Sequence, residues 1–153
     1  MGKIESIIAR MAGQRAYLDT NIFVYFLDRN PEFFQAASAF IEAAESGRII
    51  GYTGDTAVAE ALAKPYQLDN VGLAASFKAF FATDDFLSIQ SHDADTFDLA
   101  AQFRGKRGMK FIDALHYATA LKAGCKFFVT NDEDFKSDDT MEVILIKALL
   151  KKR

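Results

Sequence analysis

Residues 16–27 read AYLDTNIFVYFL, and this stretch decides how the rest of the chain is interpreted. Three residues that suit a strand are followed directly by Asp19, and from Ile22 onward apolar side chains recur with the spacing of a helix. A short apolar run that leads into an amphipathic helix is typical of a buried parallel strand and its crossover helix. The stretch therefore predicts an α/β unit with an acidic side chain at the carboxyl end of its strand.

The same alternation of short apolar runs and longer amphipathic stretches continues to the end of the chain. Further strands are expected at residues 49–52, 86–89, 126–129 and 142–146. Helices are expected at about residues 4–11, 31–47, 55–64, 73–81, 94–103 and 111–123. The helix at about residues 55–64 is expected to stop before Pro65, because the residue preceding a proline disfavours helix. The pattern predicts a three-layer α/β/α fold around a mostly parallel sheet of four to five strands.

Length and composition limit the class of protein. A chain of 153 residues with 50% hydrophobic and 25% charged residues has the size and composition of one globular domain. We expect a helical extension at residues 1–15, the main domain at 16–146 and a basic tail at 147–153. The single cysteine excludes an internal disulfide and a zinc cluster, and no apolar run is long enough to span a membrane or to serve as a signal peptide. A cytoplasmic location is expected.

Acidic residues stand at positions that the expected fold brings together. Asp19 and Asp132 each follow an apolar strand, and parallel strands end at the same edge of a sheet, where such folds bind ligands. Glu60 and Asp113 are isolated acids within apolar helical stretches. Clustered carboxylates repel one another, and a hard divalent cation removes that cost. Acidic ligands without histidine or cysteine at matching spacing indicate one or two Mg²⁺ or Mn²⁺ ions.

Each acid also has an ordinary structural explanation. Asp19 could cap the helix that follows it, and Asp132 could belong to a turn. Glu60 and Asp113 could each be partly exposed helix acids. Any of these explanations is adequate for one residue, but the four acids together favour a metal site.

Four motifs carry a resemblance to a known family. They are the stretches LDTNI at residues 18–22, TGDTAVAE at 53–60, DALHYATA at 113–120 and VTNDEDF at 129–135. In this order and spacing they resemble the PIN-domain nucleases, particularly the toxin ribonucleases of the VapC type. The resemblance covers about residues 16–146 and implies a PIN-like fold. About fifteen residues precede the first strand here, whereas family toxins usually begin almost at that strand.

The resemblance also implies roles for particular residues. Catalytic and metal-binding roles fall to the quartet Asp19, Glu60, Asp113 and Asp132. Supporting roles fall to Asn21, Thr130 and Asp134, the last being an alternative ligand within the fourth motif. The implied reaction is cleavage of single-stranded or loop RNA by metal-activated water, leaving a 5′-phosphate and a 3′-hydroxyl. A homodimer and an antitoxin partner are implied as well.

A basic stretch precedes the Asp113 helix. It contains four cations, Arg104, Lys106, Arg107 and Lys110, and its glycines Gly105 and Gly108 predict a flexible loop. Contact with RNA phosphates and simple solvation of the loop are both open interpretations. The net charge of −3, from 18 basic and 21 acidic residues, argues weakly against a nucleic-acid partner, and this local patch answers that objection in part.

Other interpretations of the sequence remain. A catalytically silent PIN-fold module that binds RNA or protein is the main alternative, and DNA in place of RNA is another. An aspartyl phosphatase would need a second acid at the position of Asn21. His116 is expected to have a packing or supporting role, and no role is expected for His92. Aromatic residues of the 31–47 helix are expected to be chiefly core, with some exposed for a partner.

Overall fold

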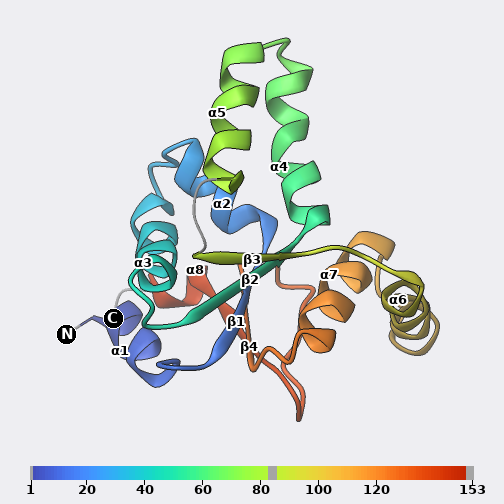
Figure 1. Ribbon diagram of the computed structural model, residues 1–153. Helices are drawn as coiled ribbons and strands as arrows, with labels where there is room; N and C mark the ends of the chain where they lie inside the picture. Colours follow the sequence, from blue (N-terminus) through green and yellow to red (C-terminus); the bar gives the residue numbers. More distant parts are fainter. Residues whose placement is uncertain (1, 83–85, 151–153) are drawn as a thin grey trace.

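The computed structural model describes residues 2–82 and 86–150, and its centre is a sheet of five parallel strands. The strands are β1 Arg15–Leu18, β2 Ile50–Gly54, β3 Leu87–Gln90, β4 Phe127–Thr130 and β5 Glu142–Leu145. They lie in the order β3-β2-β1-β4-β5, and every neighbouring pair is parallel (Figure 1). The predicted α/β fold with a mostly parallel sheet is confirmed, with all five strands in the sheet.

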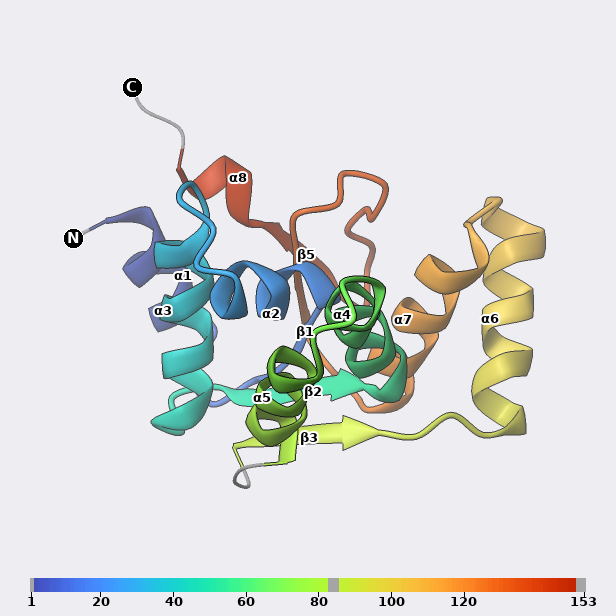
Figure 2. The same ribbon diagram turned by 90° about the horizontal axis from the view of Figure 1, so that it is seen from above.

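Helices connect the strands and cover the sheet. In the described residues they are α1 Lys3–Arg10, α2 Thr20–Leu27, α3 Phe34–Glu45, α4 Asp55–Gln67, α5 Val71–Ala82, α6 Ala94–Arg107, α7 Phe111–Lys122 and α8 Ile146–Leu149. In Figures 1 and 2, α1 and α3 lie on one side of the sheet and α6 and α7 on the other. A hairpin of α4 and α5 projects beyond the sheet. None of these helices is long and apolar enough to cross a membrane.

The two central strands alternate their side chains between two hydrophobic clusters. Ala16 and Leu18 of β1 belong to the cluster beneath α1 and α3, whereas Tyr17 belongs to the cluster beneath α6 and α7. In β4, Phe128 joins Tyr17, and the two rings stack with centroids 5.1 Å apart. Because both faces are covered, these strands contain apolar or aromatic residues at consecutive positions.

The N-terminal segment packs against the domain that follows it. Ile8 and Met11 are fully buried in the α1 and α3 cluster. On the outer side, the Arg10 guanidinium donates two hydrogen bonds to the Glu142 carboxylate, at 2.7 and 2.8 Å, and so joins α1 to β5. The segment is therefore held by both apolar packing and an ion pair.

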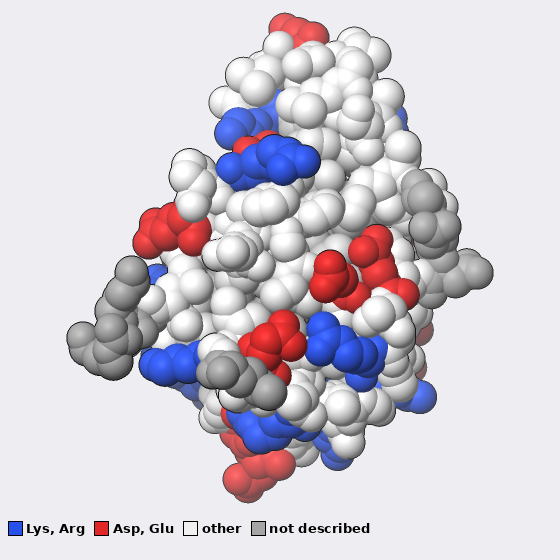
Figure 3. Space-filling view, turned by 90° about the vertical axis from the view of Figure 1, so that its left-hand side faces the viewer, with Lys and Arg blue, Asp and Glu red and all other residues white. Residues whose placement is uncertain are grey.

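The aromatic residues around α3 divide between core and surface. Phe40 is fully buried, whereas Phe33 and Phe34 are half-buried, and Phe34 stacks on Phe26 with a centroid distance of 5.7 Å. On the side of the molecule that carries α3, uncharged side chains occupy much of the middle, with small groups of charged residues around them (Figure 3). The expectation that part of this aromatic stripe contacts a partner stays a prediction.

Two local expectations were wrong. The helix expected to stop before Pro65 continues to Gln67, because a proline in the last turn removes only one hydrogen bond and its ring is buried. The flexible loop expected from residue 104 begins later, because α6 continues to Arg107. Basic side chains in the last turn suit the negative end of a helix dipole, and Gly108, with a φ of 68°, ends the helix.

Candidate active site

Asp19 lies where β1 ends and α2 begins, and it is only 4% exposed. Its Oδ1 accepts a hydrogen bond from the backbone N–H of Thr20 at 2.7 Å, so the residue does cap α2. Its Oδ2 accepts a second hydrogen bond, from the Thr130 hydroxyl of the neighbouring strand β4, at 2.6 Å. Burial raises the pKa of Asp19, although these hydrogen bonds and nearby His116 oppose the shift. Asp19 is thus held by hydrogen bonds from the start of α2 and from β4.

Glu60 projects from α4 toward the same place. Its Oε1 accepts hydrogen bonds from the Thr20 hydroxyl at 2.5 Å and meets Nε2 of His116 at 2.7 Å. Burial works to raise the pKa of Glu60, but the hydrogen bonds from His116 and Thr20 outweigh it and the pKa is lowered. The contacts with His116 and Thr20 therefore favour the charged carboxylate of Glu60.

His116, on α7, lies between Asp19 at the end of β1 and Glu60 of α4. The imidazole is 2% exposed; its Nδ1 lies 2.7 Å from the Tyr17 hydroxyl, and its Nε2 lies 3.6 Å from Oδ1 of Asp19. Burial disfavours the charged ring, but the hydrogen bond to Glu60 and the nearby acids outweigh this and raise the pKa of His116. The sequence predicts a supporting role for His116, but not its contacts with Tyr17 and Thr20.

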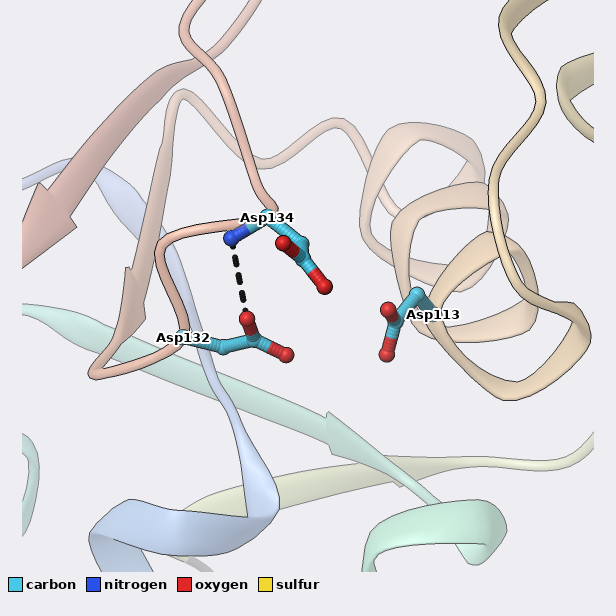
Figure 4. A group of neighbouring side chains, drawn as sticks. All are labelled: Asp113, Asp132 and Asp134. Carbon is cyan, nitrogen blue, oxygen red and sulfur yellow. Dashed lines mark hydrogen bonds between the residues drawn. The ribbon is translucent and has the colours of Figure 1, made fainter.

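Three further carboxylates converge next to these residues. Asp113 comes from α7, and Asp132 and Asp134 come from the loop after β4; each offers an oxygen within 4.8 Å of the others (Figure 4). The backbone N–H of Asp134 donates to Oδ1 of Asp132 at 2.9 Å, which fixes the loop. Burial, followed by the charges of Asp132, Asp19 and Asp134, raises the pKa of Asp113 to about 6.

One cleft contains all four acids of the predicted quartet. It is lined by Asp19, Thr20, Asn21, Val24, Glu60, Asp113, His116 and Asp132. Asn21 bridges the two strand ends, because its amide donates to the Thr130 hydroxyl at 3.4 Å and its Oδ1 accepts from the backbone N–H of Asn131 at 3.2 Å. The structure therefore brings the quartet and its supporting residues Asn21 and Thr130 together at one edge of the sheet.

Asp134 lies at the boundary with a second hollow, lined also by Arg107, Lys110 and Asp113. The Lys110 ammonium is 3.8 Å from Oδ2 of Asp134, so this cation adjoins the acids. Arg107 has other partners: its guanidinium lies 3.2 Å from Asp138 and packs on aromatic rings of α6 and α7.

The remaining two cations of the basic stretch differ from each other. The Arg104 guanidinium donates to the backbone oxygen of Met109 at 3.3 Å, and Lys106 is exposed on the last turn of α6. Among the four predicted RNA-contact residues, Lys110 is thus the one in contact with the acidic group.

The chemistry of these donors suits a hard divalent cation. The cluster offers carboxylate oxygens only, and the raised pKa of Asp113 reflects burial first and then the repulsion of neighbouring acids. A cation such as Mg²⁺ or Mn²⁺ binds oxygen ligands and neutralises that repulsion. Asp113, Asp132 and Asp134 fit such an ion, with Asp19 and Glu60 on the adjoining wall of the cleft.

The fold and the sequence of this chain match one known protein family. A parallel α/β/α fold with convergent acids at the strand ends is the arrangement of a PIN domain, and the sequence model of the PIN domain family matches residues 16–139. The chain therefore belongs to the PIN domain family. No curated protein sequence matches it significantly.

Solved structures with the same fold include bacterial toxins. VapC20 of Mycobacterium tuberculosis, a sarcin-ricin loop cleaving toxin, is 15% identical with a TM-score of 0.63, covering 78% of this chain and 91% of its own. A toxin–antitoxin complex from Klebsiella pneumoniae is 18% identical with a TM-score of 0.62, covering 84% and 95%. VapBC2 from Rickettsia felis, bound to a promoter DNA fragment, is 19% identical with a TM-score of 0.64, covering 86% and 98%. At these identities the likeness concerns the fold.

Proposed function

We propose that this chain is a metal-dependent endoribonuclease of the VapC type, the toxin of a toxin–antitoxin pair. The observation that carries the proposal is the single cleft that contains Asp19, Glu60, Asp113 and Asp132, brought from two strand ends and two helices. A module that only bound RNA or protein would have no use for converging acids, because they repel phosphate and cost folding free energy.

The residues of the cleft have distinct parts in the proposed reaction. Asp113, Asp132 and Asp134 would hold Mg²⁺ or Mn²⁺, with Asp19 and Glu60 completing the acidic wall. When bound, such a cation supplies Lewis acidity, which activates water and neutralises charge on a phosphodiester. Lys110, next to Asp134, is placed to contact a neighbouring phosphate of the substrate.

The proposed partners follow from the family and from the solved relatives. A VapC-type toxin cleaves single-stranded or loop RNA, and two of the structural neighbours are complexes of a toxin with its antitoxin. We therefore propose RNA as the substrate, an antitoxin as the partner and a homodimer as the assembly. The half-buried aromatic residues Phe33 and Phe34 are available for such a protein contact.

The test is cleavage of a mixed single-stranded RNA pool with Mg²⁺, with Mn²⁺ and with chelator. Asp113→Asn and Asp19→Asn should reduce the cleavage rate by at least about a hundredfold, since each removes a charge from the cation site. Glu42→Gln, an exposed acid of α3, is the matched control and should cut as the unchanged protein does.

The outcomes separate the possible activities. Metal-dependent cleavage that is lost in both Asn variants supports the ribonuclease. Binding of RNA without cleavage, with the variants unchanged, would instead identify a silent binding module. Equal cleavage of single-stranded DNA would contradict RNA as the specific substrate.

A further inference from the structure

Exposed aromatic side chains gather beside the acidic cleft. Phe97 of α6 and Phe111 of α7 are each 44% exposed, and Ile112, next along α7, is 37% exposed. The rings of Phe97 and Phe111 are nearly parallel, with an interplanar angle of 8° and centroids 6.4 Å apart. Neither ring belongs to the described hydrophobic clusters or lines the acidic cleft. Large apolar surface left open to water is unfavourable, so the exposed pair indicates a binding partner.

The pair is held in place by its neighbours. His92 packs edge-on against Phe97, with centroids 6.2 Å apart, and its Nε2 accepts a hydrogen bond from the backbone N–H of Thr56 at 3.2 Å. On the other side, the Arg104 guanidinium carbon lies 6.0 Å from the centroid of the Phe111 ring. A rigid pair of rings binds a flat partner with little loss of conformational entropy.

Position and charge indicate what that partner is. Phe111 and Ile112 directly precede Asp113 in the first turn of α7, so Phe111 lies within one helical turn of an acid that lines the cleft. Lys110, the residue before Phe111, is the cation in contact with Asp134, and Arg104 borders the ring of Phe111. Aromatic rings interleaved with cations bind single strands, because bases stack on the rings while cations bind the phosphates.

We propose that Phe111 and Phe97 form a stacking platform for an unpaired base of single-stranded RNA, with Arg104 beside it and the adjoining phosphates directed over Lys110 toward Asp113. The inference rests on the proposed ribonuclease function and adds the feature of the substrate that is recognised: a base free of pairing. It also explains why single-stranded or loop RNA suits the site, since a paired base presents no free face to a ring.

The test measures binding by fluorescence anisotropy in chelator, so that no cleavage occurs. One probe is a labelled single-stranded RNA of mixed sequence, and the other is an abasic ribose-phosphate chain of the same length. Phe111→Ala should weaken binding of the first probe about tenfold and leave the second nearly unchanged. Phe111→Leu should behave as Phe111→Ala does, whereas Phe111→Tyr should keep the affinity, because stacking needs a ring rather than apolar bulk.

Controls keep the result specific to the platform. Val71→Ala removes an apolar side chain that is 79% exposed at the start of α5, and should change neither affinity. Phe97→Ala provides a second variant should Phe111→Ala fail to fold. Equal losses for both probes, or no loss for either, would overturn the platform; the latter would leave a protein partner as the use of the pair. If the unchanged protein binds neither probe, the platform is refuted, while the cleavage test still decides the ribonuclease proposal. Metal-dependent cleavage unaffected by Phe111→Ala likewise refutes the platform alone.

Discussion

At the scale of single residues, the buried imidazole of His116 decides how the cleft is arranged. It contacts the Tyr17 hydroxyl on one side and the Glu60 carboxylate on the other, both at 2.7 Å. The imidazole and the Thr20 hydroxyl together hold the Glu60 side chain, which is 40% exposed. Tyr17 of β1 thereby positions the Glu60 carboxylate of α4 through the His116 ring, so Tyr17 and His116 are positioning residues.

Tyr17→Phe tests that role. Removing the hydroxyl leaves Nδ1 of a buried imidazole without its partner, which should lower the free energy of unfolding by about 1–3 kcal/mol. RNA cleavage should fall as well, because the ring no longer holds Glu60. Urea unfolding and cleavage rates measure the two effects, with Tyr66→Phe, at an exposed tyrosine of α4, as the control. A variant with unchanged stability and rate would contradict the positioning role.

At the scale of elements, the loop between β4 and β5 carries two acids of the cation site, and Asp138 anchors it. The Asp138 carboxylate accepts hydrogen bonds from the Tyr117 hydroxyl of α7 and from Arg107 of α6. Within the loop it accepts further hydrogen bonds from the backbone N–H groups of Thr140 and Met141, at 2.9 and 3.0 Å. The position of the loop therefore depends on helices on one face of the sheet.

Asp138→Ala should loosen this anchor and destabilise the protein by about 1–3 kcal/mol near neutral pH. Burial works to raise the pKa of Asp138, but the hydrogen bonds from Tyr117 and Thr140 hold it well below its ordinary value. A carboxylate with a lowered folded-state pKa stabilises the fold above its unfolded pKa of about 3.9, and the contribution is lost as pH falls through the folded-state pKa.

The stability difference between Asp138→Ala and the unchanged protein should therefore be largest above about pH 4 and shrink in stronger acid. Urea unfolding at neutral pH and below pH 3 measures it. Asp139→Ala, at the exposed neighbouring acid, should show little difference at either pH. A difference that grew on acidification would be the wrong sign for this account.

Some features of these elements could be predicted from the sequence, and others could not. Strand ends at Asp19 and Asp132 were predictable, because apolar runs locate strands and parallel strands share an edge. The contact of Tyr17 with His116 was not, since it depends on how α7 crosses the sheet. The C-terminal ends of α4 and α6 were predicted wrongly. Pro65 and Gly105 disfavour helix only locally, and packing and the basic side chains of the last turn outweigh that preference.

At the scale of the whole molecule, α1 joins the edge strand β5 to the hydrophobic cluster beneath α3. Ile8→Ala should lower the free energy of unfolding by about 2–5 kcal/mol, because it opens a cavity at a fully buried position. Cleavage per folded molecule should be unchanged, since α1 contributes no residue to the lining of the cleft. Thermal unfolding measures the first effect, and Lys3→Ala, an exposed position on the same helix, is the control. A loss below about 1 kcal/mol would show that α1 contributes little to the fold.

The order of the strands has a consequence for the chain during its synthesis. Asp19 is made early, yet its Oδ2 is held by a hydroxyl of β4 that lies 111 residues further along. Because β1 sits between β2 and β4, one edge of β1 stays unpaired until β4 has left the ribosome. A nascent chain that ends before β4 has no assembled cleft. Under the proposed function, a cell that makes this protein is exposed to RNA cleavage only after β4 has been made and paired with β1.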